Sequence, residues 1–327
     1  MEKQINEFLE KIKDAEKQES QGQYFNAAFL YKDAIKIGRN SKNQTKLKYC
    51  KNKMIEMNLK SKKEYKQAGF TQKIDNKKID TLIKNFFGKD GLDTILKKIG
   101  MESTFRPSCE KIKGMKVPVF TFLASTSVVS EDGHVVKGGE DSEKMWFSQM
   151  YSLDQDFVMA IYVEKMFLKL MSRKGVNRLN SKNLINYLEN SKVFNDKNFS
   201  IIKRGIERYF ARDYVSTMHI LIPQFESVFL DISQKLGIDI TKINDTEDIS
   251  TEKKTLSQWN FEEERFIKAW GKDLCQQIKH VFFDPLGFKL RHKVAHGEID
   301  INECNFRNAT LMTYFYIVLA SILKVNK

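Results

Sequence analysis

The sequence has few of the features that mark secreted, disulfide-bonded or membrane proteins. Its four cysteines are scattered along 327 residues without a CxxC pair, which argues against a disulfide framework and against a cysteine-based zinc site. The first turns are polar and charged, so no secretory signal is expected. The longest apolar run, about residues 309–323, contains hydroxyl side chains and is shorter than the about 20 residues that span a bilayer. We therefore expect a cytoplasmic protein with no membrane partner.

The sequence does have an excess of basic residues in its first third. Residues 1–116 hold 27 Lys and Arg against 15 Asp and Glu, whereas residues 117–327 hold 28 against 27. Lysine and arginine bind polyanions because they displace counterions from phosphates. A solvated surface rich in lysine, as A/T-biased codon usage would produce, explains the same excess. Both interpretations stay open from the sequence.

Apolar residues recur at helical spacing over most of the chain, which predicts a mainly α-helical fold. Residues 1–70 are expected to form a helical hairpin region, residues 71–140 a basic helical linker with a small β-hairpin, and residues 141–327 a helical bundle. The β-hairpin is predicted because β-branched runs flank Asp132-Gly133, a dipeptide typical of tight turns.

Start and stop signals divide the helical regions further. We expect helices over residues 78–87, 92–99, 142–171, a short one with Ser181 as N-cap, and then 198–210, 213–236 (kinked at Pro223), 261–283, 286–295 and 305–325. The polar residues 241–257 are expected to be a loop or a partly disordered insertion.

Small and aromatic residues recur three or four positions apart within residues 22–35, as on one face of a helix, among them Tyr24, Ala27, Tyr31 and Ala34. This pattern resembles one tetratricopeptide repeat or a microtubule-interacting-and-trafficking helical hairpin. The resemblance covers one unit, whereas stacked repeats need about three units to be stable. It implies either a structural hairpin or a groove for a regulatory protein partner.

The clearest chemical signal lies at residues 291–297, which read RHKVAHG. Gly297 is placed to end a helix in the left-handed conformation, which would put His296 in the last turn. On a regular helix Arg291 and His296 would point about 140° apart, because each residue advances about 100°. A helix end and the long arginine side chain would let them converge.

His292 and His296 lie four residues apart, as two zinc ligands on one helical face would. No glutamate follows His292 as in HExxH, and the other histidines are far away in the sequence. We therefore expect neither a metal nor a cofactor. A basic helix end with two surface histidines is the alternative that carries no chemistry.

Residues 290–297 (LRHKVAHG), followed by an amphipathic closing helix, resemble the signature of the HEPN superfamily, in which an Arg precedes a His by a short spacer, here four residues. Residues 209–215 (YFARDYV), 221–226 (LIPQFE) and 120–124 (FTFLA) resemble an uncharacterised branch of that superfamily. The resemblance covers roughly residues 117–325. It implies a helical bundle that forms a homodimer, with two Arg/His motifs facing each other.

The resemblance further implies a metal-independent endoribonuclease that acts on RNA, of the kind found as effectors of toxin or antiphage defence systems. His296 would be the principal acid/base and Arg291 the phosphate clamp, because imidazole transfers protons near neutral pH and guanidinium presents a planar fork of donors. His292 stands where the family often has Asn, and would share proton transfer or orient Arg291. Glu226 would pair with Arg291 from a neighbouring helix, or would be an ordinary surface acid. The alternative function is a non-catalytic module that binds RNA or nucleotide, or scaffolds a partner.

Overall fold

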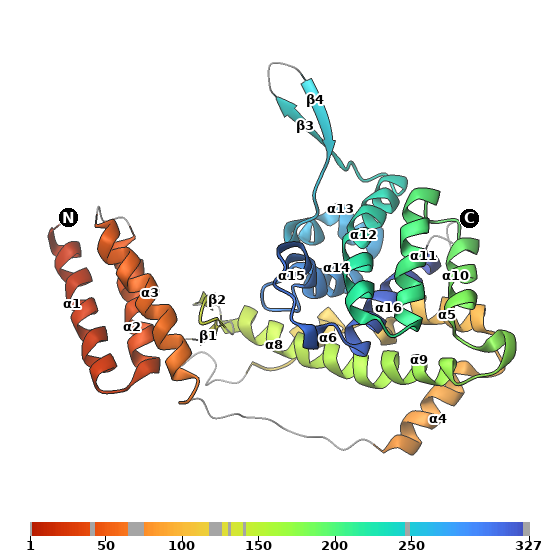
Figure 1. The fold of residues 1–327 in the computed structure, drawn as a ribbon, viewed down its shortest axis with the longest axis horizontal. Coiled ribbons are helices and arrows are strands. Elements are labelled where there is room, and N and C mark those ends of the chain that lie inside the picture. Colours follow the sequence, from red (N-terminus) through yellow and green to blue (C-terminus); the bar gives the residue numbers. More distant parts are fainter. Residues whose placement is uncertain are drawn as a thin grey trace. The chain divides into compact units, whose positions relative to one another are not determined.

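The computed structural model describes residues 2–39, 43–64, 75–117, 126–129, 132–139, 142–245 and 249–322. The chain is mainly α-helical, as the sequence predicts (Figure 1), and it divides into two units. Unit 1 comprises Met1–Lys73 and Pro118–Ser142, and unit 2 comprises Ile74–Val117 and Glu143–Lys327. The expected middle region, residues 71–140, is thus shared: its β-hairpin groups with the N-terminal helices and its helices group with the bundle.

The described part of unit 1 contains α1 (Glu2–Ser20), α2 (Tyr24–Gly38) and α3 (Gln44–Ser61), and α2 packs against both of the others. Small side chains allow this close packing, since Ala15, Ala27 and Ala34 are completely buried. Tyr31 is buried in the same core and donates its hydroxyl to Glu19. The core of this unit therefore contains the small and aromatic residues that recur three or four positions apart in the sequence.

Two strands complete the described part of unit 1. β1 (Thr126–Val129) pairs antiparallel with β2 (Val135–Gly139), so the predicted hairpin is confirmed, and Gly133 in the connection has a φ of +81°. The Gly133 carbonyl accepts a hydrogen bond from Asn58 of α3 at 2.8 Å, which fixes the hairpin to that helix. The apolar run expected to open this element covers residues 117–123, of which 118–123 lie outside the described residues.

Unit 2 is a helical bundle. Its longer helices are α4 (Asn76–Phe87), α5 (Leu92–Met101), α8 (Ser142–Phe157), α9 (Glu164–Met171), α10 (Ser181–Asn190), α11 (Asp196–Phe210), α12 (Tyr214–Lys235) and α16 (Phe306–Ile322). Shorter helical segments are η1 (Ser103–Phe105), α6 (Cys109–Lys113), the π-helical η2 (Val158–Val163), η3 (Gly175–Asn177), η4 (Gln258–Glu262), α13 (Glu264–Trp270), α14 (Lys272–Ile278), the π-helical η5 (Lys279–Phe283), α15 (Leu290–His296) and η6 (Ile301–Glu303).

Side-chain caps explain where several of these helices begin. The Asp213 carboxylate accepts the Ser216 N–H at 3.1 Å and opens α12, which contains Pro223 as expected. The prediction that Ser181 caps α10 was wrong by one residue. Asn180 is the cap, because its side-chain oxygen accepts the Asn183 N–H at 2.9 Å.

Three further predictions in unit 2 were wrong. Within the segment 241–257, expected to be a loop, β3 (Thr241–Asp245) and β4 (Ile249–Lys253) form an antiparallel hairpin. The single helix expected over 261–283 is interrupted at Gly271, which has a φ of +82°, outside the helical range. The helix expected from residue 286 begins only at Leu290, after Lys289 with a φ of +52°.

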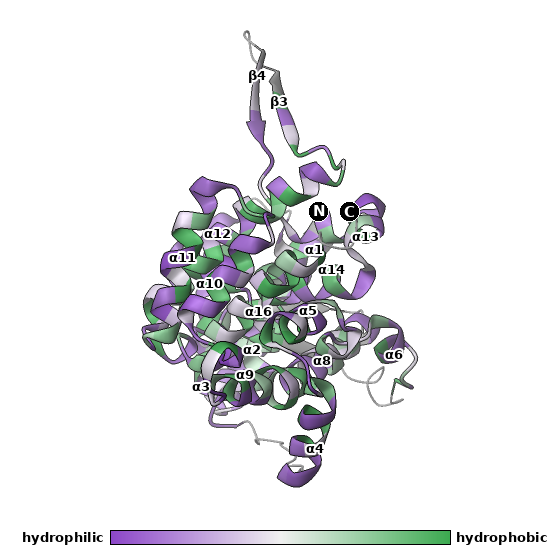
Figure 2. Cartoon of the chain, turned by 90° about the vertical axis from the view of Figure 1, so that its right-hand side faces the viewer, coloured by the Kyte–Doolittle hydropathy of each residue, from purple (hydrophilic) through white to green (hydrophobic). Residues whose placement is uncertain are grey.

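α16 lies at the centre of unit 2, where the flanking helices surround it (Figure 2). Every residue from position 309 to 321 is buried. Its polar side chains find partners inside the core, since Tyr316 donates to the Leu221 carbonyl and Thr310 shares a hydrogen bond with Tyr209, both at 2.8 Å. Among the described residues no helix is both long and apolar enough to cross a membrane.

Candidate active site

The helix α15 carries the Arg/His motif and is fixed to the bundle through one face. Leu290 is fully buried, and Val294 packs against the core one turn later. Both residues share a face because they are four positions apart, and this face contacts α12 and η5. His292 and His296 therefore lie on the outward side of α15.

The loop before α15 folds back on η5. The Phe288 N–H donates to the His280 carbonyl at 3.0 Å, and the Leu286 N–H donates to the Asp284 carboxylate at 2.9 Å. A Cβ at Gly287 would lie 1.9 Å from the His280 carbonyl oxygen, so this position requires glycine. These contacts determine where the motif helix begins.

Gly297 ends α15 as the sequence predicts. Its φ of +68° is left-handed, and the following Glu298 N–H donates to the Lys293 carbonyl at 2.7 Å. His296 therefore occupies the last turn.

Arg291 is held by Glu226, a residue of α12. The Arg291 Nε–H donates to Glu226 Oε2 at 3.0 Å, and the backbone N–H of Leu256 donates to Glu226 Oε1 at 2.9 Å. The Glu226 side chain is 17% exposed and that of Arg291 is 30% exposed. The pairing expected of Glu226 is thus present, and within the described part of the chain the two terminal amino groups of Arg291 make no hydrogen bond.

The two histidines are in direct contact. The ring centroids of His292 and His296 are 4.2 Å apart, and His292 Nε2 lies 3.6 Å from a Glu298 carboxylate oxygen. Partial burial lowers the pKa of His292, and the positive charge of Lys289 and the neighbouring His296 lower this pKa further. His292 is therefore biased toward the neutral imidazole, which can accept a proton.

Two cations flank this pair of rings. Arg291 and Lys293 lie about 100° to either side of His292 on the helix. Lys293 forms an ion pair with Glu303, so each cation has its own carboxylate partner. The structure brings Arg291 together with Glu226, and His292 together with His296. No hydrogen bond or ring contact joins Arg291 to His296 in the described part of the chain.

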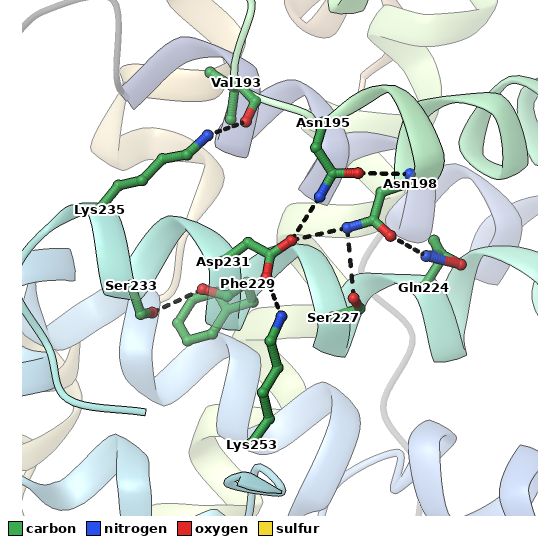
Figure 3. Close-up of polar contacts among 10 residues, drawn as sticks. All are labelled: Val193, Asn195, Asn198, Gln224, Ser227, Phe229, Asp231, Ser233, Lys235 and Lys253. Atoms are coloured by element: carbon green, nitrogen blue, oxygen red, sulfur yellow. Dashed lines mark hydrogen bonds and ion pairs between the residues drawn. The ribbon is translucent and has the colours of Figure 1, made fainter. Parts of the chain in front are cut away.

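A polar network that the sequence analysis did not predict links the β3–β4 hairpin to α11 and α12. The Asp231 carboxylate accepts hydrogen bonds from Asn195, Asn198 and Lys253 (Figure 3). Asn198 in turn accepts from Gln224 at 2.8 Å. Together with the Leu256 contact to Glu226, these bonds hold the base of the hairpin at two carboxylates of α12. The partners of Asp231 are at least 22 positions away in the sequence, so no local sequence pattern predicts this network.

The described residues contain no group of three or more His, Cys, Asp or Glu side chains arranged to hold a metal ion. No protein-family model matches the chain, and comparison with curated proteins and with solved structures gives no match either. The resemblance to the HEPN superfamily therefore rests on the sequence alone.

Proposed function

We propose that unit 2 is a metal-independent endoribonuclease of the HEPN type, which acts through a composite Arg/His site formed by two copies of the chain. One observation carries the proposal. Glu226 orients Arg291 through Nε alone, so that the terminal amino groups stay available, and a contacting pair of imidazoles lies on the adjacent outward face of the same helix.

These groups suit cleavage by the ribose 2′-hydroxyl. A base removes the proton of the 2′-hydroxyl, O2′ bonds to phosphorus, the bond from phosphorus to O5′ breaks, and an acid protonates O5′. The products are a 2′,3′-cyclic phosphate and a free 5′-hydroxyl. Arg291 stabilises the negative charge that builds on the phosphate oxygens, and His296 is the principal acid/base. His292 is the second proton carrier or a partner that orients His296.

The geometry of α15 favours a site made by two copies. Arg291 and His296 are about 140° apart around the axis of a regular helix, which favours a phosphate held by one residue from each copy. A two-fold axis near the exposed face of α15 would bring Arg291 of one copy opposite the partner's His296. Such a dimer would contain two equivalent sites.

The test is cleavage of total RNA by the purified full-length chain in the presence of a chelator. We expect cleavage by the wild type, and loss of at least about 100-fold in rate for Arg291→Ala and for His296→Ala. Lys293→Ala is the matched control, because it removes a cation from the same helix on the side away from Arg291. We expect it to retain most of the activity.

Three outcomes would overturn the proposal. They are cleavage that survives both substitutions, cleavage that the chelator abolishes, and equal losses in all three variants. Tight binding of RNA or nucleotide without turnover would identify a non-catalytic binding module instead. A role as the effector of a toxin or defence system, with a regulatory protein on the N-terminal helices, stays a prediction.

A further inference from the structure

The helix α8, which runs along one edge of unit 2 (Figure 1), has a polar buried side and an apolar exposed side. Ser148, Tyr151 and Gln155 are buried, with at most 8% of each residue exposed. By contrast, Leu153 is 45% exposed and Phe157 is 42% exposed. A helix at the edge of a bundle normally has the opposite arrangement, because burial of apolar area drives its packing. The exposed side of α8 is therefore a candidate contact surface.

The polar side holds α8 in this rotation. Gln277 of α14 donates to Gln155 Oε1 at 3.0 Å. The Ser148 and Tyr151 hydroxyl groups and Gln155 Nε2 have no hydrogen-bond partner among the described residues, although buried polar groups are usually paired. Burying such groups costs stability. This rotation of α8 therefore has a cost that a contact on its apolar side would offset.

Four apolar residues form one line on the outer side of α8. Trp146, Met150, Leu153 and Phe157 are spaced by four, three and four positions, so they lie within about 60° of one another around the helix axis. Trp146 and Met150 are half-buried, and the other two are exposed. Gln155 lies about 170° from the centre of this line. We call the four residues the apolar stripe of α8.

The spacing of the apolar stripe indicates that its partner is a helix. Apolar residues at alternating steps of three and four form the contact line between two packed helices. An extended peptide would instead need free backbone donors and acceptors, which the interior of a helix does not offer. A stripe of this kind fits a second copy of itself, because a two-fold axis places the same surface on both partners.

The charges beside the stripe favour one direction of packing. Asp154 and Asp156 border it on opposite sides, near its C-terminal end. In a parallel pair of helices, Asp154 of one copy would lie next to Asp156 of the other on both sides. In an antiparallel pair, the two carboxylates would instead lie across from the uncharged Phe147 and Gln149. Neighbouring like charges destabilise helices, so the antiparallel pair is favoured.

We propose that two copies of the chain bind each other through their apolar stripes, packed antiparallel about a two-fold axis between Met150 and Leu153. Trp146 of each copy then packs against Phe157 of the other. The inference rests on the proposed function for the identity of the partner, and it deepens that function by naming the surface that joins the copies. α8 and the motif helix α15 both contact η5, so the interface is linked to the motif through one element.

Sedimentation velocity of the full-length chain over the micromolar range tests the interface. We expect the wild type to dimerise reversibly. Leu153→Glu with Phe157→Glu should weaken dimerisation by about 100-fold or more, because two charges would be buried against apolar side chains. Val176→Glu with Ile201→Glu is the matched control, since it replaces two apolar residues of unit 2 that are 84% and 41% exposed outside α8. We expect the control to dimerise like the wild type.

Three results would overturn the interface. They are a wild type that stays monomeric, as it would if unit 1 covered the stripe, a dimer that survives the Leu153/Phe157 substitutions, and equal weakening in the control. Thermal unfolding monitored by circular dichroism checks that both double variants fold.

Cysteine crosslinking tests the direction of packing. Trp146→Cys and Phe157→Cys are made in separate chains, which are then mixed and oxidised, with the wild type as the control for the native cysteines. We expect a disulfide-linked dimer in the mixture and little in either variant alone, because the two positions face each other only in the antiparallel pair. Crosslinking within each single variant, and none above it in the mixture, would overturn this arrangement.

The two proposals fail in different ways. If the Leu153/Phe157 variant loses the dimer but the wild type cleaves no RNA, the interface stands and the nuclease proposal fails. If the wild type cleaves RNA and its dimer survives these substitutions, the interface is overturned and the nuclease proposal stands. If both proposals hold, the Leu153/Phe157 variant should cleave RNA more slowly at protein concentrations where it is monomeric and the wild type is dimeric.

Discussion

Glu226 bridges Arg291 and the backbone of Leu256, accepting one hydrogen bond on each carboxylate oxygen at 3.0 and 2.9 Å. The segment that follows the β3–β4 hairpin and the arginine of the motif are therefore held by the same side chain. A carboxylate that accepts two donors in this way limits how far the arginine can turn.

Glu226→Gln tests this arrangement, because an amide offers only one acceptor oxygen to two donors. We expect kcat to fall about 10- to 100-fold with little change in KM, which corresponds to the loss of one hydrogen bond to a charged group. Stopped assays with varied RNA concentration separate the two constants. Glu207→Gln is the control, since that residue forms an exposed ion pair with Arg204 on α11. An increase in KM with an unchanged kcat would contradict a positioning role for Glu226.

Arg291→Lys tests whether the fork of the guanidinium matters. An ammonium that pairs with Glu226 has no second, rigidly placed donor for a phosphate oxygen. We expect a loss of about 100-fold or more in kcat/KM even though the positive charge is kept. If the lysine variant cleaves RNA as fast as the wild type, Arg291 acts through its positive charge alone.

The stability of unit 2 should depend on pH through His280. Burial lowers the pKa of His280 to about 4, and the nearby Asp284 opposes this shift only in part. The unfolded chain, with an ordinary histidine pKa, therefore takes up a proton first as the pH falls. Stability is complete above about pH 6.5 and declines toward pH 4, by about 2 kcal/mol between pH 7 and pH 5.

Urea unfolding at these two pH values measures the effect. The His280→Gln variant removes the titrating group, and we expect the difference between the two pH values to shrink by about 2 kcal/mol in this variant. An identical pH dependence in the variant and the wild type would show that His280 titrates normally.

His292 should titrate below the ordinary histidine range. Burial is the main cause of the lowered pKa, followed by the charge of Lys289 and by His296. Lys289→Gln should therefore raise the midpoint, and Glu298→Gln should lower it further because the carboxylate favours the protonated ring. NMR titration of the imidazole signals gives these midpoints. A rise of the His292 midpoint after Glu298→Gln would contradict the assignment of Glu298 as the neighbour that favours the protonated ring.

Gly297→Ala should strain the end of α15. The left-handed φ of +68° costs an alanine about 1 kcal/mol, while no atom lies within 4 Å of the added methyl group. Gly237, with a φ of +84° and equally open space, is the matched control at the end of α12. We expect similar losses of unfolding free energy in both alanine variants, and reduced RNA cleavage only for Gly297→Ala. Equal cleavage in the two variants would show that the helix end does not affect the site.

Local signals explain which parts of the fold could be predicted. Asp213 as a cap and Gly297 as a helix end depend on neighbouring residues alone, and the structure confirms both. The interruption of the helix at Gly271 was not predicted. The apolar pattern over residues 261–283 is continuous, and a glycine within such a pattern is also compatible with a helix. The strands β3 and β4 were missed because their sequences are polar, and because the contacts of Lys253 and Leu256 with α12 join residues more than 20 positions apart.

The same limit applies to the site. The motif itself could be found from spacing, since Arg291, His292 and His296 lie within one short helix. The contact with Glu226 could be proposed only as one of two alternatives, because 65 residues separate the partners. Glu298 and Lys289, which influence His292, gave no sequence signal beyond their proximity.

The burial of α16 on all sides restricts how two copies of this chain can meet. From position 309 to 321 the helix presents nothing to the exterior, so its apolar surface is fully used within one subunit. A second copy must therefore contact other parts of the bundle, where exposed apolar side chains such as Phe157 and Leu168 lie among charged ones. In a contact made by such a mixed surface, salt would weaken the ionic part and leave the apolar part unchanged.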